Sequence, residues 1–159
     1  MPNAKSNVIL GIDPGPSQSA YVVWDTKTQT IVDHGQSDNI TFRKNIIWVK
    51  DDIEPDICVI EGMAFYGKVM NGESFDTLMY IGRLQEIFED NHELVYFPDI
   101  AYHFCNSRRG IKTSHINAVL TNRFGGKGTR KQPGVFYGIR EHEWSALSAA
   151  IFYQDKIRG

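Results

Sequence analysis

Three side chains that could do chemistry stand at the ends of predicted regular elements. Asp13 closes the apolar segment 7–13, Glu61 closes the apolar segment 56–61, and His142 opens the last amphipathic segment. In open α/β sheets, ligands bind at the carboxyl ends of strands, where a carboxylate is held rigidly and still reaches a ligand. Two converging carboxylates repel one another, and a hard divalent cation is the common compensation. The pattern therefore predicts a metal site at Asp13, Glu61 and His142.

Each of these residues also has a simpler interpretation. An Asp before Pro-Gly is often only a turn residue, a Glu at a strand end is often solvated, and a His at a helix start is often a cap. Their joint placement, together with a basic segment elsewhere, favours the functional interpretation. Two ions about 4 Å apart can activate water and stabilise the leaving oxygen in phosphodiester hydrolysis.

The basic segment covers residues 100–140, which carry eight Lys or Arg side chains and no Asp or Glu. The rest of the chain carries nine basic and all 19 acidic residues, so the net charge of −2 hides a local positive field. Such a field attracts phosphates, although a solvated surface loop is the alternative interpretation. The eight residues are Arg108, Arg109, Lys112, Arg123, Lys127, Arg130, Lys131 and Arg140.

The hydrophobic pattern predicts an α/β fold, with a mixed sheet flanked by helices. Turn residues at 14–17 join the first two strands as a hairpin, Thr41 is the expected cap of the first helix, and Pro55 and Pro98 end elements. The expected strands are 7–13, 20–25, 29–34, 56–61 and 94–97, and the expected helices are 41–53, 74–89, 113–124 and 141–156.

Length and composition favour a single domain over residues 1–159 in a reduced, intracellular protein. The chain is 42% hydrophobic and 23% charged, which supports a packed core. The sequence contains no run of eighteen apolar residues, so it predicts no membrane span, and no secretory signal is visible. Cys58 and Cys105 form neither a disulfide framework nor a metal-type pair.

Four segments together resemble the RuvC family of Holliday-junction resolvases. The segment GIDPGPSQSAYVVWD resembles the family's first hairpin, whose first strand ends in Asp-Pro-Gly. The segment VIEGMAFYGK resembles the family's second motif, a strand that ends in the catalytic Glu. GIKTSHINAVL resembles the family's lysine before a helix, and REHEWSALSAAI resembles its last motif, in the style of phage or divergent bacterial members.

This resemblance implies an RNase H-like fold with a five-stranded sheet, a homodimer, and paired nicks in four-way DNA junctions with Mg²⁺ or Mn²⁺, two ions in number. Asp13 and Glu61 match the first two catalytic carboxylates. Lys112 matches a lysine that would stabilise charge on the scissile phosphate, although an ordinary solvated lysine is the alternative.

The third motif departs from the family pattern of two Asp residues three apart. Here His142 takes the first position and Ser145 the second, and a serine is a poor ligand for Mg²⁺. Glu143 or Glu141 supplies the missing oxygens, or the metal has fewer protein ligands; we favour His142 with Glu143. His142 either binds the metal or orients and deprotonates the attacking water.

DNA contacts are expected from an aromatic loop and from the basic segment. Phe65 or Tyr66 would stack on bases splayed at a junction, unless they cover the core or join a dimer contact. The 74–89 helix is apolar enough to meet a partner subunit, and Gly82 within it is consistent with a close helix approach. The expected phosphate contacts are Arg108, Arg109, Lys112, Lys127, Arg130 and Lys131.

The sequence therefore predicts a metal-dependent endonuclease that resolves four-way or other branched DNA in the cytoplasm. A phage-encoded protein that acts in the host cell is the variant of this prediction that the last motif favours. Three alternatives stay open. One is an RNase H-like nuclease that cuts hybrids, flaps or forks, and another is a catalytically weak junction binder. The third, an actin-like or sugar-kinase nucleotide site, is disfavoured because it needs two domains.

Overall fold

A computed structural model describes residues 7–65 and 67–159, and it contains a five-stranded mixed sheet in the order β3-β2-β1-β4-β5. β1 (Val8–Asp13), β2 (Gln18–Asp25) and β3 (Thr30–Asp38) run antiparallel in succession, whereas β4 (Ile57–Glu61) and β5 (His92–Val95) run parallel to β1. The helices are α1 (Asn39–Trp48), α2 (Gly72–Phe88), α3 (Phe97–Cys105), α4 (Thr113–Phe124) and α5 (Glu143–Arg158). The expected fold class is confirmed.

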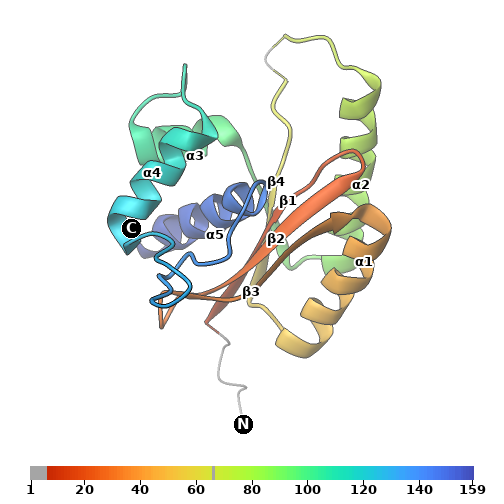
Figure 1. The fold of residues 1–159 in the computed structure, drawn as a ribbon. Coiled ribbons are helices and arrows are strands. Elements are labelled where there is room, and N and C mark those ends of the chain that lie inside the picture. Colours follow the sequence, from red (N-terminus) through yellow and green to blue (C-terminus); the bar gives the residue numbers. More distant parts are fainter. Residues whose placement is uncertain (1–6, 66) are drawn as a thin grey trace.

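Helices cover both faces of the sheet (Figure 1). α1 and α2 lie on one face, and α3, α4 and α5 lie on the other. Because side chains alternate along a strand, β1 and β4 each feed two cores. Leu10 and Ile60 pack with the α1 and α2 residues, whereas Ile9 and Val59 pack with α5. Burial on both faces explains why these two strands are apolar almost throughout.

Gly11 brings α5 close to β1. A Cβ at this position would overlap the carbonyl oxygen of Ala146 and would lie 3.1 Å from the Cβ of Ala150. No other residue type leaves that space empty, so the glycine sets how deeply the amino-terminal half of α5 sinks onto the sheet. The same contact fixes the height of the residues that precede α5.

Several predicted boundaries are wrong for identifiable reasons. β3 does not stop at Gly35 but continues to Asp38, because its pairing with β2 extends as far as Gln18. The first helix starts at Asn39, and its cap is Asp38 rather than Thr41, since the Asp38 carboxylate accepts from two backbone N–H groups. Its α-helical part ends at Trp48, and a π-helical turn, Val49–Ile53, follows.

The helix α3 was missed by the sequence analysis. The pattern predicted a strand over 94–97 that Pro98 closes, but the strand is His92–Val95 and Pro98 lies in the first turn of the helix. Proline is favoured there because its missing N–H would have no partner in the helix anyway. Pro98 therefore belongs to the start of α3 and does not mark the end of the preceding strand.

The sequence predicts no membrane-spanning segment. Within the described residues, none of the helices combines the length and the apolar character that crossing a bilayer requires.

Replacing Gly11 with Ala should destabilise the fold and disturb the seat of α5. Overpacking against a backbone carbonyl should lower the unfolding free energy by about 1–3 kcal/mol, measured by urea denaturation. Gly72→Ala is the matched control, because a Cβ at Gly72 meets nothing within 4 Å. Equal stabilities for the two variants would contradict the close approach.

Candidate active site

The register of the sheet brings Asp13 and Glu61 side by side. β1 and β4 are parallel neighbours, and Ile12 lies opposite Ile60. One further step along both strands reaches Asp13 and Glu61, so the two strands end in carboxylates at the same edge. By alternation, Asp13 shares its face with Gly11, and this is the face that α5 covers.

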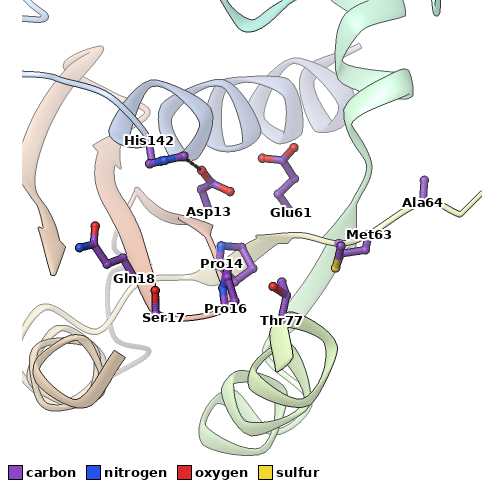
Figure 2. A pocket seen from close by; sticks show the side chains of 12 residues that line it. Asp13, Pro14, Pro16, Ser17, Gln18, Glu61, Met63, Ala64, Thr77 and His142 are labelled. Atoms are coloured by element: carbon purple, nitrogen blue, oxygen red, sulfur yellow. Dashed lines mark hydrogen bonds and ion pairs between the residues drawn. The ribbon is translucent and has the colours of Figure 1, made fainter. Parts of the chain in front are cut away.

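His142 completes the group from the start of α5. Its ring Nδ1 lies 3.1 Å from Asp13 Oδ2 (Figure 2), and its side chain is 68% exposed, against 17% for Asp13. The close seat of α5 on β1 at Gly11 places this residue above the strand end. The three predicted chemistry-bearing residues therefore meet in one place.

The meeting point is an open cavity of about 510 Å³. The β1–β2 turn forms one side of it, the segment after β4 forms another, and Thr77 of α2 reaches in from below in Figure 2. Its lining within the described residues contains no Lys or Arg. The lining residues are Asp13, Pro14, Gly15, Pro16, Ser17, Gln18, Glu61, Gly62, Met63, Ala64, Thr77 and His142.

A hydrogen-bond network holds the β1–β2 turn in shape. The Gly15 N–H donates to Ser19 Oγ (3.2 Å), and the Ser19 hydroxyl donates to Asn39 Oδ1 (2.7 Å). Asn39 then closes the ring by donating from Nδ2 to the Gly15 carbonyl at 3.0 Å. The sequence pattern indicates neither Ser19 nor Asn39, because their connection to the turn exists only once α1 packs against it.

Burial makes the two carboxylates hard to ionise. It raises the pKa of Asp13 from 3.8 to about 6, against the opposing effect of the nearby His142. Burial and then the negative charge of Asp13 raise the pKa of Glu61 from 4.5 to about 8. Glu61 makes no side-chain hydrogen bond or ion pair with another described residue. Within the described residues, His142 stabilises the charge of Asp13, whereas Glu61 lacks a positive partner.

This donor set fits a divalent cation. Mg²⁺ is typically held by one or two carboxylates, with waters and substrate phosphates completing its coordination. Asp13 and Glu61 supply such carboxylates in a cavity that is open to solvent. Among the described residues, no group of three or more His, Cys, Asp or Glu side chains could hold a metal ion. The geometry therefore favours an open site completed by substrate rather than a structural one.

The structure does not bring the two neighbouring glutamates to the cavity. Glu143 is 1% exposed, and its carboxylate pairs with His34, at 2.8 Å from Nδ1. The exposed Glu141 accepts a hydrogen bond from Gln36 Nε2 at 2.9 Å. Ser145 does not line the cavity either. Of the alternatives left open for the third motif, a site with fewer protein ligands is the one that this geometry favours.

Among the described residues, the other predicted contact residues are not part of the cavity lining. Lys112 is exposed just before α4, and its backbone N–H donates to His115 Nδ1 at 2.9 Å. Phe65 is half-buried in the loop that follows the lining residue Ala64. Tyr66 lies outside the described residues.

The basic segment divides into parts with different surroundings. Arg123 donates two hydrogen bonds to the carboxylate of Asp155, and its guanidinium lies over the ring of Phe124. Lys127 Nζ lies 5.7 Å from the centre of the ring of Trp144, a residue in the first turn of α5. Arg130 and Lys131 are exposed in the same loop after α4, which Figure 1 shows near the β2–β3 turn.

Arg108 stacks over Tyr102 at 4.2 Å and contacts Asp99. Arg109 is exposed in the loop between α3 and α4. In Figure 1 this loop rises at the same end of the molecule as the carboxyl ends of β1 and β4. Of the two basic loops, the one between α3 and α4 therefore lies at the end of the molecule that holds the cavity.

Glu61→Gln should stabilise the metal-free protein at alkaline pH. A carboxyl group whose pKa is higher in the folded than in the unfolded state makes folding less favourable as the pH rises from about 4.5 to 8. The variant should therefore gain on the order of a few kcal/mol over the parent at pH 8 and little at pH 4, measured by urea denaturation with a chelator. A gain that is the same at both pH values would contradict the raised pKa.

Comparison with known proteins finds similarity in structure alone. No family model and no curated protein sequence matches the chain. The structure of Thermus thermophilus RuvC aligns over 95% of both chains, with a TM-score of 0.74 and 12% identity. T. thermophilus RuvC in complex with a Holliday junction substrate aligns over 95% of this chain and 94% of the other, with a TM-score of 0.73 and 12% identity. The chain therefore has a RuvC-like, RNase H-like fold.

Proposed function

We propose that this protein is a metal-dependent endonuclease that nicks branched DNA and resolves four-way junctions by paired cuts. The observation that carries the proposal is the pair Asp13 and Glu61, set side by side at the edge of a RuvC-like sheet in an open cavity. The solved RuvC complex with a Holliday junction substrate supports branched DNA as the ligand class.

Asp13 and Glu61 would hold one or two Mg²⁺ or Mn²⁺ ions, which would supply an activated water and stabilise the leaving oxygen. The remaining steps belong to the chain itself. Asp13 Oδ2 faces Nδ1 of His142 and orients the ring. Because the ring is exposed, its other nitrogen is free to accept a proton from the attacking water. The rigid β1–β2 turn keeps Asp13 in place during the reaction.

DNA would reach the cavity across the basic loops. Lys127, whose side chain reaches Trp144 in the first turn of α5, shares its loop with Arg130 and Lys131. Phosphate contacts there would position a strand without reading its sequence. Arg108, Arg109 and Lys112 would contact a second stretch of backbone, with Lys112 free to approach a phosphate. Phe65 follows the cavity-lining segment and would stack on a base unpaired at the branch point.

Paired nicks require two active sites, and α2 offers a surface for a second copy of this chain. Phe75, Leu78 and Met79 are exposed by 54%, 37% and 64%. These positions, together with Gly82, follow the three-and-four spacing of one helix face. A Cβ at Gly82 would meet nothing within 4 Å, so a partner helix could approach closely. We therefore propose a homodimer formed through α2.

Asp13→Asn should lower the nicking rate on a four-way junction by at least about 100-fold with Mg²⁺ or Mn²⁺. Junction affinity should stay within a few-fold, because the amide keeps the shape of the side chain while losing its charge. The measurement is cleavage of labelled four-way junctions, forks, flaps, RNA–DNA hybrids and linear duplex, with binding followed separately. Asp90→Asn is the matched control, since Asp90 is exposed and precedes β5, at the amino ends of the parallel strands and so away from the carboxyl ends that hold the site.

Three outcomes would contradict the proposal. Normal nicking by Asp13→Asn would remove Asp13 from the site. Equal cleavage of hybrids or linear duplex by the parent would favour a nuclease of another substrate class. Tight junction binding with no metal-dependent cleavage would identify a binding protein instead.

A further inference from the structure

Three consecutive residues at the start of α5 are each held by a side chain from β3. Gln36 Nε2 donates to Glu141 Oε2 at 2.9 Å, and Gln36 Oε1 accepts from the backbone N–H of His142 at 3.2 Å. His34 Nδ1 lies 2.8 Å and 3.2 Å from the two carboxylate oxygens of Glu143. Residues more than 100 positions apart in the sequence thus meet around His142.

The sheet places these two β3 residues level with the candidate site. Gln36 lies opposite Ala20 on β2, and Ala20 lies opposite Asp13 on β1. His34 likewise lies opposite Val22 on β2, and Val22 lies opposite Gly11 on β1, so the three residues form one row across the sheet. Residues in one row project to the same face, so both side chains point to the face that α5 covers.

The other support of this segment is local: turn hydrogen bonds run from the N–H groups of Glu143, Trp144 and Ser145 to the carbonyls three residues before them. Glu141 has a φ of +46°, a conformation that is costly for any residue except glycine and persists only where the surroundings impose it. No side chain at the helix N-cap accepts a hydrogen bond from α5, and Gln36 instead accepts from the N–H of His142. The His142 ring is mostly exposed, so packing does not fix its direction. The backbone and the contact with Asp13 set its position.

The pair of His34 and Glu143 anchors the helix end from within. Glu143 is almost fully buried, and His34 is its one side-chain hydrogen-bond partner among the described residues. A buried carboxylate in the first turn of a helix is favoured by the helix dipole but still requires a hydrogen-bond partner. His34 supplies that partner from β3, and so it ties the first turn of α5 to the sheet.

We propose that Gln36, supported by His34, is a positioning residue that fixes the backbone at 141–143 and so sets the His142 ring against Asp13. The inference rests on the proposed nuclease function for its kinetic consequence but not for its structural one. A shift of about 1 Å in a reacting group can reduce a rate by about 100-fold. The loss of Gln36 should therefore act on the chemical step rather than on DNA binding.

The first test is Gln36→Ala. We expect kcat for junction nicking to fall by about 10- to 100-fold, with KM, junction affinity and the thermal midpoint almost unchanged. The chemical shift of the His142 ring Cε1–H, followed by NMR without metal, should move toward the value in Asp13→Asn. Val32→Thr is the matched control, because Val32 is an exposed residue of the same strand, and it should leave all of these readouts unchanged.

A swap of partners tests whether the hydrogen bonds themselves matter. Gln36→Glu alone places two carboxylates face to face and should lower kcat as strongly as Gln36→Ala. Adding Glu141→Gln restores both bonds, because the new amide donates to the new carboxylate, whose other oxygen accepts from the His142 N–H. The double variant should recover kcat to within a few-fold of the parent, together with the parent ring shift.

Two results would overturn the positioning role. In one, Gln36→Ala changes neither kcat nor the His142 ring shift. In the other, kcat falls only in step with the thermal midpoint and the swap restores neither, which would make Gln36 a merely structural residue. If the parent nicks no DNA, the proposed function fails, and the ring shift in Gln36→Ala and in the swap still decides the positioning role.

Discussion

The side-by-side placement of two half-buried carboxylates is the constraint on which the rest of this structure depends. Asp13 and Glu61 end adjacent parallel strands in register, under a helix that sits close because Gly11 has no side chain. Burial raises the pKa of each group, and the charge of Asp13 raises that of Glu61 further. A fold that keeps such a pair without a Lys or Arg in the cavity lining favours a cation as the missing partner.

One side of the cavity around this pair is held by hydrogen bonds, and the other side is open to solvent. Ser19 and Asn39 lock the turn after Asp13, and β3 locks the start of α5, so the sheet side of the cavity is stiff. The opposite side is open, and the loop after β4 and the α3–α4 loop, which carries Arg108 and Arg109, lie toward that end of the molecule. This division suits a site that must hold its own groups still while a large ligand enters, as the proposed branched DNA would.

The sequence was sufficient for the parts that depend on local pattern. An apolar run that ends in an acid predicts a strand with a carboxylate at its edge, and two such runs predict the meeting of Asp13 and Glu61. Glu143 shows the limit of that reasoning, because the residue next to His142 in the sequence points into the protein and pairs with His34. Ser19, Gln36 and Asn39 have ordinary sequence contexts, and their roles arise from packing between elements that the chain pattern does not place. Pro98 was misread because proline both ends strands and begins helices.

The most direct test of the shared cation is proton release on metal binding. At pH 7 most of the Glu61 population is protonated if its pKa is about 8, and a carboxylate must lose its proton to bind a metal. Titration calorimetry with Mn²⁺ in two buffers of different ionisation enthalpy measures that release. The account predicts that the parent releases a proton from most molecules on binding, and that Glu61→Gln binds more weakly and releases far less. Equal affinity and equal proton release in the two proteins would show that Asp13 and Glu61 do not share a cation.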